Sequence, residues 1–193
     1  MVALPAQCPN VITKPKGLSG EYQIAAGNAG WPSQFRFAVH RFWSRVPELD
    51  VRRHPHPRMS WDVIVHRFPQ DIETTEQLPD GFKPPAIGSR AEIAQSIRTI
   101  FPDANISNLG WLVVDGQGFS IEVNIGNEEP CDGFMLHVRG GEAALGAVMQ
   151  IARLFEARAL DLSSCEFLDR MADPDSGFRQ WRAYRDKSVG DTK

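Results

Sequence analysis

The sequence predicts an α+β fold: a mostly antiparallel sheet of four to five strands with two to three helices packed on one face. Segments 119–125 and 134–139 alternate apolar and polar residues, which is the pattern of strands with one buried face. Segments 89–101 and 141–155 instead place apolar residues at helical spacing. The helices are therefore expected to bury their apolar stripes on one face of the sheet and to leave the other face in water.

The first elements are marked by composition and by capping residues. A strand is expected over 61–67, where WDVIVHR is rich in β-branched residues, and a loop over the polar, proline-bearing stretch 69–85. Ser89 and Glu92 form an S-x-x-E capping box, which predicts the start of a helix. Pro102 ends this helix, because proline cannot continue the backbone hydrogen-bond pattern.

Further elements complete the predicted order, which is β-α-β-β-β-α-(β)-α. Gly140 and Gly141 open the second helix, and Asp173 followed by Pro174 predicts the N-terminus of the last one. The remaining strands are expected over 110–115, 119–125, 134–139 and, as a short extended piece, 159–162.

Composition divides the chain into three parts. Residues 1–58 are interrupted by prolines and glycines and are expected to be a poorly ordered or extraneous N-terminal extension. At Met59 the sequence changes to a β-branched run, which also suggests an alternative translation start. A single α+β domain is expected over 59–186, followed by a flexible tail over 187–193.

Charge is unevenly distributed between these parts. Residues 1–58 hold eight Lys and Arg against three Asp and Glu, whereas residues 59–193 hold thirteen against twenty-one, a balance of −8. An acidic domain repels phosphate, so a nucleic-acid partner is not expected, and a basic protein suits it better. The alternative is that the excess acid only keeps the domain soluble.

The sequence also contains indications of where in the cell the protein is located. No stretch approaches the roughly 18 consecutive apolar residues of a membrane-spanning helix, so no membrane partner is expected. The N-terminus lacks an apolar region behind a basic start, which argues against a secretory signal. A cytoplasmic location is the expectation.

The polar face of the central hairpin offers one candidate site. Glu122, Asn124, His137 and Arg139 could form an acid/base site in which Glu122 orients His137 and Arg139 holds an anion. The alternative is that they form the solvent face of a half-exposed sheet, where cross-strand charge pairs add a little stability. A period-two pattern already predicts polar residues at these positions.

The loop 126–133 offers a second candidate. Glu128, Glu129 and Asp132 could bind a hard cation or contact a partner, although a solvated hairpin loop remains the simpler interpretation. The spacing does not match an EF-hand, and the three cysteines contain no C-x-x-C pair, so neither a metal nor a cofactor is expected. Cys131 lies beside acidic residues, which should raise its pKa and make it a poor nucleophile.

Four segments carry a family resemblance: MSWDVIVHRFP, the IGS before the first helix, FSIEVNIGNEEP and FMLHVRGG. Over about residues 59–186 the chain resembles an uncharacterised family of small bacterial α+β proteins that begin with a sequence like MSWDV. Small acidic proteins of this type occur as immunity proteins beside polymorphic toxins. The resemblance therefore implies toxin neutralisation, and it brings no catalytic residues with it.

Together these features favour a binding protein over an enzyme. The leading hypothesis is a non-enzymatic immunity protein that neutralises a basic bacterial toxin through an acidic surface. The alternative is a small enzyme or ligand-binding domain that uses the polar face of the hairpin. No catalytic residue is assigned, and nothing in the sequence indicates an oligomeric state.

Overall fold

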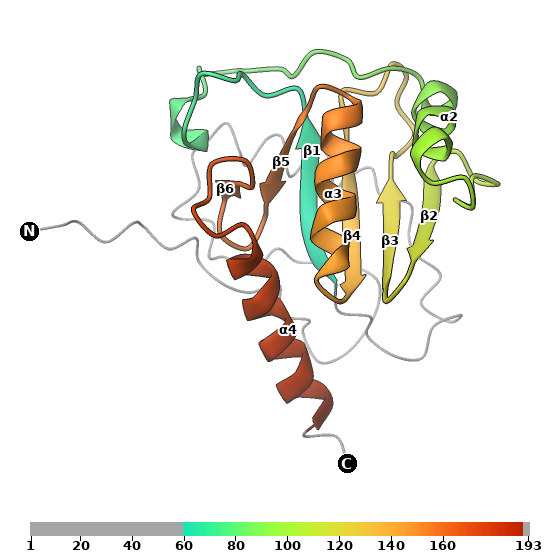
Figure 1. Ribbon diagram of the computed structural model, residues 1–193. Helices are drawn as coiled ribbons and strands as arrows, with labels where there is room; N and C mark the ends of the chain where they lie inside the picture. The colour runs from blue at the N-terminus through green and yellow to red at the C-terminus, as the bar shows by residue number, and fades with distance from the viewer. Residues whose placement is uncertain (1–59, 191–193) are drawn as a thin grey trace, which may run out of the picture.

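The structure, a computed structural model, describes residues 60–190 (Figure 1). The expected N-terminal extension 1–58 and the boundary at Met59 lie outside these residues, as do residues 191–193. The elements in chain order are β1 (Trp61–His66), the 3₁₀ turn η3 (Thr75–Gln77), α2 (Arg90–Ile100), β2 (Trp111–Gly116), β3 (Phe119–Asn124), β4 (Gly133–Gly140), α3 (Ala143–Leu154), β5 (Arg158–Asp161), β6 (Glu166–Phe167) and α4 (Asp175–Gly190). Helix α4 thus continues beyond the domain end expected at residue 186.

The strands form one antiparallel sheet in the order β2-β3-β4-β1-β5-β6. This confirms the predicted α+β class, with a mostly antiparallel sheet and three α-helices within residues 60–190. The extended piece expected over 159–162 is β5, and the sheet has one strand more than predicted. The extra strand is β6, which is only two residues long and therefore too short to show an alternating pattern.

The helices cover one face of the sheet, as expected (Figure 1). The main core between them consists of buried apolar side chains, among them Val63 of β1, Ile121 of β3, Leu136 of β4, Ile97 of α2 and Val148 of α3. Their alternate positions along each strand point them to the same side. No helix within residues 60–190 combines the length and the apolar content needed to span a membrane.

Helix α2 begins as its sequence predicts. The Ser89 hydroxyl accepts a hydrogen bond from the Glu92 backbone N–H, and the Glu92 carboxylate accepts one from the Ser89 backbone N–H at 2.8 Å. This capping box satisfies two backbone donors that the first helical turn leaves without partners. The helix ends at Ile100, just before Pro102.

The opposite face of the sheet is partly covered, which corrects the expectation that it is wet throughout. Residues 67–89, the β1–α2 segment, connect β1 to α2, and their first half lies across this face. Phe68, Ile72 and Leu78 form a second apolar cluster with side chains of the sheet. The sheet contributes Ile64, Met135, Leu160 and Phe167 to that cluster. A polar, proline-bearing sequence had predicted only a loop, because few of its residues are apolar.

A buried arginine fastens the β1–α2 segment to the sheet. Arg158 is 2% exposed, and its guanidinium donates to the backbone carbonyls of Pro69 at 2.8 Å and Ile72 at 3.0 Å. It also pairs with Asp169 at 3.0 Å and lies 3.8 Å from the centre of the Phe167 ring. A buried cation is stable only with such partners, so Arg158 fixes the path of the segment.

Helix α4 docks through aromatic contacts and a close backbone approach. The Phe178 ring lies 5.2 Å from the ring of Trp61, and both side chains are buried. Gly177 faces Asp161, which is fully buried and accepts hydrogen bonds from the backbone N–H and the hydroxyl of Ser163. Burial raises the pKa of Asp161 above its ordinary value.

Replacing Gly177 by alanine should destabilise the domain. The added Cβ would overlap Asp161 Oδ2, and this carboxylate cannot swing away because Ser163 and burial hold it. We expect a loss of about 1–3 kcal/mol in the free energy of unfolding, measured by urea denaturation. The matched control is Gly146→Ala in α3, where nothing lies near the added Cβ and alanine should stabilise the helix by about 0.5–1 kcal/mol. A loss of stability in both variants would contradict the proposed packing at Gly177.

Candidate functional site

The candidate residues of the hairpin share one face of the sheet. Glu122 and Asn124 lie on β3, and His137 and Arg139 lie on β4. In the strand register Glu122 is opposite His137, and Asn124 is opposite Met135. All four positions face away from the helices, because the alternate residues of both strands line the main core.

Their pairing differs from the one expected. Glu122 bonds Arg139 at 2.8 Å rather than orienting His137. Instead, the Nδ1 of His137 lies 2.8 Å from Oδ1 of Asp62, which also accepts a hydrogen bond from the Ser60 hydroxyl at 2.7 Å. Asp62 therefore orients the imidazole. Sequence reasoning missed it, although a lone carboxylate inside the apolar strand WDVIVH was an available signal.

Trp111 and Asn124 border this pair. The indole of Trp111 stacks on the imidazole of His137, with ring centres 5.4 Å apart and planes 20° apart. Asn124 is 1% exposed, and its side-chain nitrogen has no hydrogen-bond partner in the described part of the chain. An oriented imidazole is suited to general-base chemistry. Nevertheless, no hydroxyl or thiol of residues 60–190 bonds His137, so no nucleophile is identified there.

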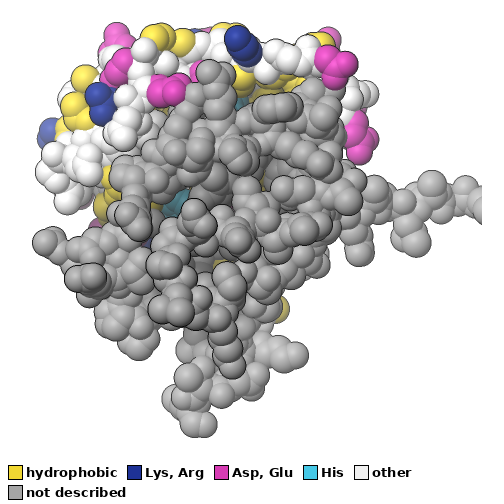
Figure 2. Space-filling view, turned by 180° about the vertical axis from the view of Figure 1, so that it is seen from behind, with side chains coloured by type: hydrophobic (Ala, Val, Ile, Leu, Met, Phe, Trp, Pro, Cys, Tyr) yellow, Lys and Arg dark blue, Asp and Glu magenta, His cyan; other side chains and the backbone are white. Residues whose placement is uncertain are grey.

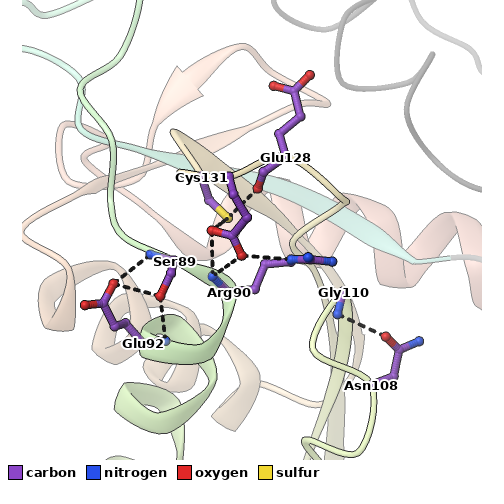
Figure 3. Close-up of polar contacts among 8 residues, drawn as sticks. Ser89, Arg90, Glu92, Asn108, Gly110, Glu128 and Cys131 are labelled. Atoms are coloured by element: carbon purple, nitrogen blue, oxygen red, sulfur yellow. Dashed lines mark hydrogen bonds and ion pairs between the residues drawn. The ribbon is translucent and has the colours of Figure 1, made fainter.

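The acidic loop between β3 and β4 contacts the start of α2 (Figure 3). The Glu129 carboxylate accepts hydrogen bonds from the backbone N–H of Arg90 at 3.0 Å and from its side-chain Nε at 2.9 Å. These bonds lower the pKa of Glu129. The contact favours a helix-capping role, because a carboxylate at a helix N-terminus is stabilised by the unpaired N–H groups and the helix dipole.

Cys131 also attaches the β3–β4 loop to the segment before α2. It forms an isolated β-bridge with Gly88, and its thiol donates to the carbonyl oxygen of Glu128 at 3.1 Å. Burial, more than the neighbouring Glu129, raises the pKa of Cys131 to about 11. The upward direction agrees with the prediction from its acidic neighbours, and the thiol is a poor nucleophile.

Asp132 meets β1 at the other end of the loop. Its backbone carbonyl lies 2.8 Å from Nδ1 of His66. A carbonyl can only accept, so the proton of the neutral imidazole is on Nδ1. The ring fills the space beside Gly133, which has no side chain. Burial lowers the pKa of His66, which keeps the imidazole neutral at pH 7.

Several acidic segments meet at one end of the sheet. His66 at the end of β1 is opposite both Gly133, which follows the acidic loop, and Arg158, which follows α3. The Arg90–Glu129 contact brings the start of α2 to the same place. The β1–α2 segment leaves β1 at this end and runs along it to α2, and Arg158 holds its carbonyls of Pro69 and Ile72 there (Figure 1). We call this region the acidic end, and its carboxylates are Asp71, Glu73, Glu76, Asp80, Glu92, Glu128, Glu129, Asp132 and Glu156.

Sequence reasoning found only part of the acidic end. Glu128, Glu129 and Asp132 were predicted, whereas the carboxylates of residues 71–80 were overlooked inside a stretch interpreted as a loop. Those of the β1–α2 segment are exposed, since its apolar residues Ile72 and Leu78 turn inward. Figure 2 shows acidic side chains along the upper rim of the described surface, interspersed with Lys and Arg.

A groove of about 460 Å³ lies at the acidic end, between the start of α2 and the end of α3. The residues that line it are Arg67, Ile87, Glu92, Ile93, Ser96, Leu154, Phe155 and Glu156. Arg67 is fixed in its wall, because its Nε donates to the carbonyl of Phe155 at 3.1 Å and its Nη1 to that of Ala86 at 2.6 Å.

Within residues 60–190, no group of three or more His, Cys, Asp or Glu side chains is arranged to hold a metal ion. Comparisons of the chain with protein-family models, with curated proteins and with solved structures find no match.

The Glu122–Arg139 pair should contribute modestly to stability. In a double-mutant cycle of Glu122→Gln and Arg139→Gln, we expect a coupling of about 0.5–1 kcal/mol in urea unfolding, since both side chains are only partly buried. The control cycle combines Arg139→Gln with Asp103→Asn, in the exposed turn after α2, and should give no measurable coupling. Equal coupling in the two cycles would contradict the specific pair.

His66 should make stability depend on pH. Its folded-state pKa is below 6.5, so the unfolded chain binds the proton more readily, and stability falls as pH drops from 6.5 through the folded-state pKa. His66→Asn retains a donor near the Nδ1 position but does not titrate. We expect the wild type to lose more free energy of unfolding than His66→Asn between pH 7.5 and pH 5. The same loss in both proteins would argue against a neutral buried imidazole.

Proposed function

We propose that the protein is a non-enzymatic binding protein that captures a basic protein through the acidic end. The supporting observation is the set of carboxylates that the β1–α2 segment, the β3–β4 loop and the ends of α2 and α3 contribute to one end of the sheet. The family resemblance suggests that the partner is a bacterial toxin, which this protein would neutralise.

The form of the β1–α2 segment supports a binding role. Residues 67–89 contain only one short 3₁₀ turn, and irregular connections longer than about 12–15 residues are uncommon and usually functional. Arg158 holds the carbonyls of Pro69 and Ile72, and Arg170 donates to that of Gln70 at 2.7 Å. A surface that is already rigid loses little conformational entropy on binding.

The charges at this end favour a basic partner. Asp71 and Glu76 are exposed and have no ion pair with any residue in 60–190. Two nearby cations are engaged, since Arg90 pairs with Glu129 and Arg158 with Asp169, whereas Lys83 of the same segment is exposed. Such a surface attracts a basic protein over a Debye length of about 8 Å at physiological salt and accelerates the encounter.

A small enzyme or ligand-binding domain is the second candidate. The observation in its favour is the 2.8 Å contact between Asp62 and His137, together with the Asn124 amide nitrogen, which has no hydrogen-bond partner among residues 60–190. Against it, Glu122 and Arg139 are engaged with each other. Turnover of a substrate that is lost in His137→Gln would favour this candidate over the binding protein.

Charge reversal at the acidic end should weaken binding of a basic probe. We expect the pair Asp71→Lys and Glu76→Lys to lower the affinity for fluorescent decalysine at least about tenfold in low salt, or 1.4 kcal/mol, measured by fluorescence anisotropy. The control pair, Asp103→Lys and Asp115→Lys, makes the same change of net charge at exposed positions outside the acidic end. Equal weakening by both pairs would mean that only net charge matters and would contradict the proposal.

The natural partner requires a separate experiment. Affinity capture from the native cell should retain a basic protein with the wild type and lose it with the Asp71→Lys and Glu76→Lys variant. Expression of that purified partner's gene should arrest growth, and co-expression of this protein should restore it. If the captured protein is not toxic, the immunity role is excluded and only the binding role is supported.

A further inference from the structure

Cys165 is disulfide-bonded, whereas Cys131, the other cysteine within residues 60–190, is a free and buried thiol. The chain has three cysteines, and the third is Cys8 in the basic N-terminal segment. Cys8 lies outside the described residues, and it is the one cysteine of the sequence that remains as a partner for Cys165.

The two described cysteines lie at opposite ends of the sheet. Cys131 is at the acidic end, just before strand β4, whose first residue pairs with the last residue of β1. Cys165 is at the other end, because the turn 162–165 begins beside Asp62 at the start of β1. The length of β1, roughly 17 Å at about 3.3 Å per residue, separates them, whereas a disulfide requires Cα atoms within about 7 Å. Cys131 therefore cannot approach Cys165 in the folded domain.

The turn that carries Cys165 is held at the point where the N-terminal segment joins the domain. The backbone N–H of Cys165 donates to the carbonyl of Asp161 at 2.8 Å, and that of Leu162 donates to the carbonyl of Asp62 at 3.1 Å. Asp62 lies at the start of β1, where residues 1–59 are joined to the domain. Since Cys165 is only partly buried, a cysteine from outside the described residues can reach it.

The connection between Cys8 and the domain is long enough for such a bond. Residues 9–59 lie between them, and a chain of this length would extend over roughly 170 Å at about 3.3 Å per residue. A thiol on the same chain meets Cys165 at an effective concentration that a second copy of the protein reaches only at high protein concentration. A bond within the chain is therefore favoured over a bond between two copies.

We propose that Cys8 and Cys165 are joined by a disulfide that attaches the N-terminal segment to the turn between β5 and β6. Formation of the bond joins the two sulfur atoms and removes one hydrogen from each thiol. The two electrons and two protons pass to an oxidant that is itself a disulfide, such as that of an exchange protein, which is reduced to a dithiol. Residues 1–58 are then a covalently attached part of the domain, in contrast to the extraneous extension that composition predicts.

The bond has consequences for the environment of the protein and for its binding surface. Disulfides form and persist in oxidising compartments and are rare in the cytosol, so the proposal favours such a compartment over the cytoplasmic location expected from the sequence. The attachment point lies at the end of the sheet opposite the acidic end. The disulfide itself therefore leaves the carboxylates of the proposed binding surface uncovered.

The test is a peptide map of the full chain without reduction. Protein from its native cells is released directly into a denaturant and an alkylating reagent, which block free thiols before air can oxidise them. Trypsin then places each cysteine in a separate peptide: Cys8 in 1–16, Cys131 in 99–139 and Cys165 in 159–170. We expect peptides 1–16 and 159–170 as one cross-linked species that separates on reduction, and Cys131 as an alkylated thiol.

Three variants give the matched comparison. Cys8→Ser and Cys165→Ser should each abolish the cross-linked species, whereas Cys131→Ser, which removes the free thiol, should leave it unchanged. Alkylation of Cys165 in the wild type would overturn the proposal, as would a cross-link of Cys165 to Cys131, to a second Cys165 or to a small thiol. A native protein that begins at Met59, and so lacks Cys8, would also overturn it.

Discussion

The buried guanidinium of Arg158 is the interaction on which the arrangement of this domain depends. Removing a cation from water costs several kcal/mol, which only close and well-oriented partners can offset. Asp169, two backbone carbonyls of the β1–α2 segment and the Phe167 ring provide them. Because these partners belong to separate parts of the chain, one side chain fixes the segment on the sheet, encloses the second apolar cluster and sets the position of the exposed carboxylates.

The acidic end combines structural and surface roles in the same carboxylates. Glu129 and Glu92 stabilise the N-terminus of α2, where negative charge is favourable, and they also add to the negative surface. Glu156 is the opposite case, since both its backbone conformation and its charge are unfavourable where it lies. Folding therefore explains the two capping carboxylates, whereas Glu156 costs stability at its position.

Local patterns were sufficient for much of the fold. Alternation in 119–125 and 134–139 predicted β3 and β4, and the S-x-x-E box located the start of α2 at Ser89. These signals arise from neighbouring residues, so they do not require knowledge of the partner strands. Strand β6 left no such signal, because two residues are too few to alternate. The covering of the second face left none either, because it depends on contacts of Phe68 and Ile72 with strands distant in the sequence.

By itself, the sequence determined that a sheet with a polar hairpin face exists and that the domain is acidic. Only the tertiary structure decided which charges meet: Asp62 rather than Glu122 orients His137, because β1 lies beside β4. It also decided that the acidic loop and the β1–α2 segment share one end of the sheet (Figure 1). The reason is physical, since side-chain periodicity specifies which face a residue occupies, whereas strand order and register specify its neighbours across the sheet.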